Sequence, residues 1–133
     1  MQATTVKGAE KVLRKWFPVK EKQTVDYAFT VKDGNGIGIP AANFFAVTLT
    51  FYNPETGAIV NLREDQDVLN ANNVTISAAG VVTWSLQLPD VTISNQLATD
   101  ETHRALFRFF WAAGAKHFPH EVDFVIENLG KLT

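Results

Sequence analysis

The sequence has no cysteine among its 133 residues, so neither a disulfide nor a thiolate metal site is available to it. No apolar run approaches the roughly 20 residues that a membrane-spanning helix needs. An apolar signal-peptide core is also missing, because charged residues interrupt the N-terminal segment between Lys7 and Lys15. Synthesis in the cytoplasm and no contact with a membrane are therefore expected.

Signatures of catalysis and of cofactor binding are missing too. The glycines of residues 34–38 precede Ile39-Pro40 and a strand, whereas a phosphate loop opens a helix, so a turn is expected. The same stretch fails as a calcium loop, because Phe44 stands where the bidentate glutamate belongs. No Gly-x-Ser-x-Gly elbow and no acid–base pair of carboxylates is present. We therefore expect no enzyme, no catalytic residue and no cofactor.

The histidines and the acidic residues favour no metal site. His117 and His120 flank a Phe-Pro pair without a recognisable third ligand, which favours an exposed turn over zinc binding. His103 has acidic neighbours but no nucleophile to activate. A solvated acidic loop explains the carboxylates within residues 64–67 better than a surface cation site does.

Charge is distributed unevenly along the chain. Residues 1–22 carry six basic and two acidic groups, a net charge of +4, whereas the remainder carries six basic and twelve acidic groups, a net charge of −6. A basic arm on an acidic body suits nucleic acid or an acidic protein surface, including that of a neighbouring copy. The arm has few charges and no arginine cluster, which disfavours nucleic acid.

Residues 1–18 differ in pattern from the rest of the chain. Their apolar residues fall at near-helical spacing, Thr4 or Thr5 can cap a helix, and Pro18 would end it, although Gly8 opposes it by about 1 kcal/mol. The segment is either a helix packed on its own domain or an arm that orders on a partner. We predict an N-terminal basic amphipathic arm at 1–18 and a β-sandwich domain at 19–133. The candidate partner-binding residues of the arm are Lys11, Arg14, Lys15, Trp16 and Phe17.

From residue 19 onward, alternating apolar residues between turn signals indicate strands. Turns are expected at 33–36 and 53–57, and a polar connection at 63–73. Strands are expected at 24–31, 44–52, 58–62, 74–76 and 81–88, with 91–93 resuming the last one. Alternation places Phe45, Val47, Leu49 and Phe51 on one face of one strand and Val82, Trp84, Leu86 and Leu88 on one face of another.

Residues 103–128 read as a two-stranded ribbon that contains six of the fifteen aromatic residues. A ribbon this apolar needs a second sheet to cover it. Alternation assigns Phe107, Phe109 and Trp111 to that buried face. Leu106 and Phe110 fall on the opposite face, where they are candidates for a contact between subunits.

Seven or eight short strands and one helix candidate predict an all-β fold. The spacing favours an immunoglobulin-like antiparallel β-sandwich with an N-terminal arm or short helix, and a jelly roll or a small barrel is the alternative.

A series of motifs then resembles a known family. Residues 24–34 are followed by Tyr52-Asn-Pro-Glu-Thr-Gly57, by Ala79-Gly-Val-Val-Thr-Trp-Ser-Leu-Gln-Leu-Pro-Asp90, and by Glu121-Val-Asp-Phe-Val-Ile-Glu-Asn-Leu129. This order resembles the immunoglobulin-like domains of tailed-bacteriophage virion proteins, including the N-terminal domain of baseplate upper proteins. The resemblance implies a non-enzymatic structural protein, made in the host cytoplasm and located in the virion.

The free-standing domain and its basic arm favour one position in the particle. We expect a capsid decoration or cement protein that binds the shell, other virion proteins and its own copies as a homo-oligomer. A tail, baseplate or head–tail connector component is the first alternative. A carbohydrate-binding or adhesion module is the second, because sandwich loops and exposed aromatic rings suit it.

Overall fold

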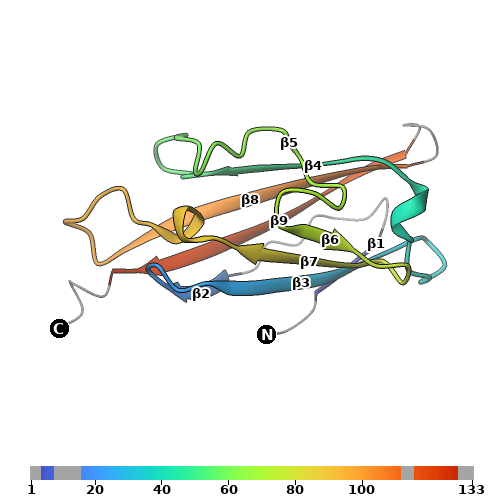
Figure 1. Cartoon of the computed structure of the whole chain (residues 1–133), viewed down its shortest axis with the longest axis horizontal. Helices are drawn as coiled ribbons and strands as arrows, with labels where there is room; N and C mark the ends of the chain where they lie inside the picture. The colour runs from blue at the N-terminus through green and yellow to red at the C-terminus, as the bar shows by residue number, and fades with distance from the viewer. Residues whose placement is uncertain (1–3, 8–15, 112–115, 129–133) are drawn as a thin grey trace.

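A computed structural model describes residues 4–7, 16–111 and 116–128 of the chain, and shows two sheets packed face to face (Figure 1). The four-stranded sheet has the order β1 (Thr4–Lys7), β3 (Val25–Lys32), β7 (Val81–Leu86) and β6 (Val74–Ile76). The five-stranded sheet has the order β2 (Trp16–Lys20), β9 (Lys116–Glu127), β8 (Asp100–Trp111), β4 (Phe44–Tyr52) and β5 (Gln66–Asp67). Two short 3-10 helices, η1 (Ala41–Asn43) and η2 (Leu88–Val91), lie in the connections.

The strand order confirms the predicted fold class. Strands β3, β7 and β6 are antiparallel neighbours, as are β9, β8 and β4, so the two sheets repeat the B-E-D and G-F-C order of an immunoglobulin sandwich. Strands β1 and β2 pair in parallel with β3 and β9, respectively, which makes both sheets mixed.

The helix considered for the N-terminal segment is wrong for the part of it that the structure describes. Thr4–Lys7 and Trp16–Lys20 are strands, the second of which runs alongside Asp123–Glu127 of β9. Pairing with an existing sheet satisfies the backbone groups of this segment without a helix that would have to include Gly8. Strand β2 also crosses the expected domain boundary between residues 18 and 19. Lys11, Arg14 and Lys15 lie outside the described residues.

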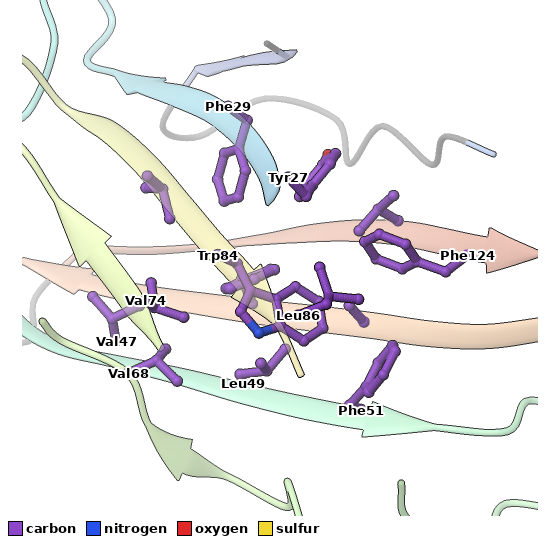
Figure 2. Close-up of a cluster of buried hydrophobic side chains, with 14 of the residues drawn as sticks. Tyr27, Phe29, Val47, Leu49, Phe51, Val68, Val74, Trp84, Leu86 and Phe124 are labelled. Atoms are coloured by element: carbon purple, nitrogen blue, oxygen red, sulfur yellow. The ribbon is translucent and has the colours of Figure 1, made fainter. Parts of the chain in front are cut away.

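Aromatic rings fill the space between the two sheets. Figure 2 shows Trp84 of β7 among side chains of the facing sheet, and its ring meets that of Phe51 edge to face, with centroids 4.9 Å apart. Phe124 meets Trp84 in the same way at 5.5 Å. Such edge-to-face pairs are favoured by the ring quadrupole. The predicted inward positions of Phe107 and Phe109 are confirmed, since both are fully buried, and Trp111 packs half-buried against the core.

The start of β4 departs from simple alternation. The register between β4 and β8 shifts between Phe44 and Ala46, so the pleat contains one extra residue. Phe44 turns inward and is 6% exposed, whereas Phe45 is 69% exposed. The prediction that Phe45 shares a face with Val47, Leu49 and Phe51 is therefore wrong, because those three side chains are buried.

Three other predicted strand segments are not strands. The stretch predicted at 58–62 contributes one isolated bridge, between Tyr52 and Ile59, and the edge position beside β4 belongs to β5. Asn61 and Leu62 both have positive φ, which ends any extended pairing there. Strand β7 stops at Leu86, because Pro89 initiates η2 and removes a backbone donor. Leu88 is consequently exposed and does not share the buried face of Trp84 and Leu86, and 91–93 does not resume the strand.

Candidate functional site

The end of the sandwich where β4 and β7 finish is organised by a buried ion pair. The guanidinium of Arg63 meets the carboxylate of Asp90 through two hydrogen bonds, Nε to Oδ1 at 2.6 Å and Nη2 to Oδ2 at 2.9 Å. Both side chains are almost entirely excluded from solvent. Arg63 also lies over the indole of Trp84, with its Cζ 5.4 Å from the ring centroid. The pair therefore ties the connection after β4 to the connection after β7 and to the core.

His103, at the start of β8, adds a second tie to the same connection. Its Nδ1 lies 2.9 Å from the backbone oxygen of Asp90, and its Nε2 lies 2.5 Å from Oε2 of Glu101. A tyrosine near the start of the equivalent strand bonds upstream backbone in immunoglobulin sandwiches, the arrangement called the tyrosine corner. His103 likewise bonds backbone upstream of its strand, at Asp90, and so ties the start of β8 to the connection after β7.

Glu101 remains a charged group although it is buried. Burial raises the pKa of Glu101, but hydrogen bonds from His103, Ser94 and Asn95 outweigh this effect and hold the pKa below its ordinary value of 4.5. The Ser94 hydroxyl donates to Oε1 at 2.8 Å. This carboxylate holds Ser94 and Asn95, in the link between η2 and β8, against the start of β8.

The tied connections border a cavity of about 460 Å³ that is open to solvent. It lies between residues 58–61, residues 88–94 and the start of β8. These segments are at the end of the sandwich opposite η1 (Figure 1). The wall is mainly apolar, and the Glu101–His103 pair is among its few polar groups. Its apolar lining consists of Ala58, Ile59, Val60, Leu88, Pro89 and Ile93.

A smaller cavity of about 140 Å³ adjoins the first one. The two cavities share Asn53, Ser94 and Glu101 as lining residues. The smaller cavity is polar and is lined by two further carboxylates, those of Glu55 and Asp100. Both residues are exposed to solvent.

The outer face of the five-stranded sheet holds the two residues of β8 proposed for a subunit contact. Leu106 and Phe110 both point away from the core, as alternation predicts, and both are half-buried. Phe110 stacks on His117 of β9 with ring centroids 4.6 Å apart.

The same outer face carries a partly buried ion pair. Arg104 donates from Nε to Oδ1 of Asp123 at 2.7 Å and from Nη2 to Oδ2 at 3.1 Å. The hydrogen bonds to Asp123 raise the pKa of Arg104 above its ordinary value, against the opposing effect of burial. The pair links β8 to β9 on the side away from the core.

The remaining candidate residues are not gathered at one place. Trp16 and Phe17 belong to β2, at the edge of the five-stranded sheet. His120 was expected in an exposed turn, and this is wrong. It is fully buried, because β9 extends through it and turns its ring inward to within 2.9 Å of the Tyr27 hydroxyl and onto Phe29.

The sequence motifs weighed for ligand binding have structural explanations. Gly36 occupies a turn with a φ of 80°, and a Cβ on Gly38 would lie 1.9 Å from the carbonyl oxygen of Ala79. Glycine is therefore required there by close backbone approach. Within the described residues, no three histidine or acidic side chains are grouped so as to hold a metal ion. The same part of the chain contains no helix long and apolar enough to cross a membrane.

The aromatic rings considered for carbohydrate stacking are packed inside or against the core. Phe118 is buried, and Trp111 meets it edge to face at 5.0 Å. Among the described aromatic side chains, the ring that is most exposed is that of Phe45, which alternation had placed on the same face as Val47.

The comparisons with known proteins concern the fold. No family model matches the sequence, and no curated protein matches it. Among solved structures, the N-terminal domain of phage TP901-1 ORF48 is similar over 92% of this chain and 94% of that chain, with a TM-score of 0.50. The sequence identity is 8%, so the likeness is one of fold. The chain is thus an immunoglobulin-like β-sandwich with a phage domain among its structural neighbours.

Proposed function

We propose that the chain is a structural protein of a tailed-phage particle. The observation that carries this proposal is the likeness to a phage domain along nearly the full length of both chains. The motif series of residues 24–129 supports the same class of protein independently of the coordinates. Fold alone hosts many functions, so the agreement of these two sources is the basis of the proposal.

The proposed mode of action is passive docking. A rigid sandwich presents its loops and its strand edges to neighbouring virion proteins and to further copies of itself. Trp16 and Phe17 on β2, with Leu106 and Phe110 on β8, are the proposed contacts on the five-stranded sheet, joined by Lys11, Arg14 and Lys15 of the arm. Many weak contacts of this kind add up in a symmetric particle because each is effectively intramolecular after the first.

Within the particle, we place the protein in the tail or baseplate. The resemblance in sequence includes the N-terminal domain of baseplate upper proteins, and the structural neighbour is itself an N-terminal domain of a phage protein. Capsid decoration, the position expected from the sequence, is the competing one.

The test is immunogold electron microscopy on particles purified by density gradient. Antibody against the recombinant chain is expected to label the distal tail, and mass spectrometry of the same particles is expected to detect the chain in several copies. Label on the head would show that the protein belongs to the capsid and not to the tail. Particles that lack the chain altogether would refute a virion role.

A further inference from the structure

The end of the sandwich that holds the two cavities is also where exposed apolar side chains gather. Six large hydrophobic residues of the described chain are exposed, and four of them belong to this end's connections. Ile59 and Leu88 line the larger cavity, while Leu62 and Leu97 lie in the same two connections. We call the two cavities and these four side chains the end surface. Exposed apolar side chains in the connections that border an apolar hollow indicate a surface that becomes covered.

The backbone at Leu62 supports this interpretation. Leu62 is 90% exposed and has a φ of 58°, next to Asn61 with a φ of 54°. Two successive non-glycine residues in the left-handed region are costly, and Leu62 gains no burial within its own chain in return. Such outliers are retained at functional surfaces more often than elsewhere.

The end surface is also held rigid. The Asn61 side chain donates to Oδ1 of Asp90 at 3.0 Å, and Arg63 donates to both oxygens of the same carboxylate. The turn that displays Leu62 is thus clamped on both sides. A preformed hollow loses little conformational freedom when it is filled, which favours binding.

Charge identifies the kind of occupant. The described residues that line the two cavities include the carboxylates of Glu55, Asp100 and Glu101, and no lysine or arginine. Such a surface repels phosphate groups, which disfavours nucleic acid and anionic lipid. It attracts a cation placed beside an apolar group, because the acidic cavity adjoins the apolar one.

We infer that the end surface is a docking site for a peptide segment of a partner protein, in which an apolar side chain fills the larger cavity and an adjacent lysine or arginine meets Glu55 and Asp100. The volume of about 460 Å³ suits one or two large side chains. This inference rests on the proposed function, because the partner is taken to be a neighbouring virion protein whose peptide segment binds the end surface.

The test is selection from a random peptide library against the recombinant chain, with counter-selection against the variant Ala58→Trp. Ala58 is exposed and lines the larger cavity, so an indole there fills the cavity without disturbing the core. Selected peptides are expected to pair a large apolar residue with lysine or arginine one or two positions away. Labelled with fluorescein, they are expected to bind the original chain and to lose binding to Ala58→Trp.

Two further variants separate the parts of the site. Reversing both exposed carboxylates, in Glu55→Lys with Asp100→Lys, is expected to weaken binding about tenfold at low salt and less at high salt. Phe45→Ala, at the opposite end of β4, is the control and is expected to leave binding unchanged. Peptides that bind Ala58→Trp as well as the original chain, or an enriched set without basic residues, would overturn the inference.

The outcome is independent of the test of the proposed function. If no peptide is enriched over the counter-selection, the docking site is refuted while labelling of particles still decides the virion role. If selected peptides bind as expected but particles contain none of the chain, the site stands and the virion role fails.

Discussion

Asp90 shows how one buried side chain sets the geometry of a whole end of the molecule. Its carboxylate accepts hydrogen bonds from Arg63, from the Asn61 amide and from the backbone N–H of Gln87, at 2.6 to 3.0 Å. Its backbone oxygen accepts a hydrogen bond from the imidazole of His103. A buried charge without partners is expensive, so this site must be satisfied almost completely to persist.

Removing the charge of Asp90 is therefore expected to be costly. In Asp90→Asn the Arg63 guanidinium stays buried without a counter-charge, and the free energy of unfolding is expected to fall by about 3–5 kcal/mol. Glu127→Gln, which breaks the exposed contact with Lys20 at 3.4 Å, serves as the matched control and is expected to cost less than about 1 kcal/mol. Urea unfolding of both variants measures the difference. Equal losses would show that the buried pair does not organise this end.

Glu101 provides a prediction about pH. Its pKa is lowered in the folded chain, so it contributes stability above its ordinary pKa of 4.5 and loses this contribution as pH falls through the lowered value. Glu101→Gln is expected to be less stable than the original chain near neutral pH, and the gap is expected to shrink at acidic pH, below about 4.5.

Urea midpoints measured from neutral pH down to about pH 3 follow this gap. Glu64→Gln, which alters an exposed carboxylate, controls for general effects of charge. A gap that stays constant, or widens on acidification, would mean that the ionised form of Glu101 is not the stabilising one.

At the scale of the element, β4 shows which features of a strand follow from its own sequence and which depend on its neighbours. Its bounds agree with the sequence prediction, because alternation runs up to the Asn53-Pro54 turn at one end. The bulge between Phe44 and Ala46 did not follow from the sequence, since two adjacent phenylalanines satisfy either register. Pairing with β8 decides between them.

The two phenylalanines at the bulge give a matched pair of variants. Phe44→Ala removes a buried ring and is expected to lower the free energy of unfolding by about 3–5 kcal/mol, less if the site collapses. Phe45→Ala removes a ring that is 69% exposed and is expected to change it by less than about 1 kcal/mol. Thermal and urea unfolding measure both. The reverse ranking would show that Phe45 and not Phe44 faces the core.

Elements without strong alternation were harder to predict. The apolar spacing of residues 4–17 fits a helix, but an open edge on β9 offers parallel pairing to Trp16–Lys20, and tertiary context overrides local preference. His120 illustrates the same limit at one residue. Its polar ring can be buried because it forms a hydrogen bond with the hydroxyl of Tyr27, which is distant in sequence.

For the whole molecule, the layered architecture was predictable and the end surface was not. Regular alternation and turn signals suffice for two sheets over an aromatic core. The cavities are formed by two connections some 30 residues apart, and the Arg63–Asp90 pair joins these connections. From the sequence, Arg63 was assigned to a polar connection and Asp90 to a break in a strand, so their pairing was not predicted. The sequence offered one usable signal, an arginine among acidic residues followed later by a Pro-Asp pair.

The central claim is that this sandwich serves as a virion subunit held by its end surface. The most direct measurement places a photo-crosslinking amino acid at position 59, with position 45 as the control, in chains incorporated into phage particles. Irradiation is expected to join position 59 to another virion protein, within a segment that carries lysine or arginine beside an apolar residue, and to leave position 45 largely unreacted. Incorporated chains that crosslink from position 45 but not from position 59 would contradict the account.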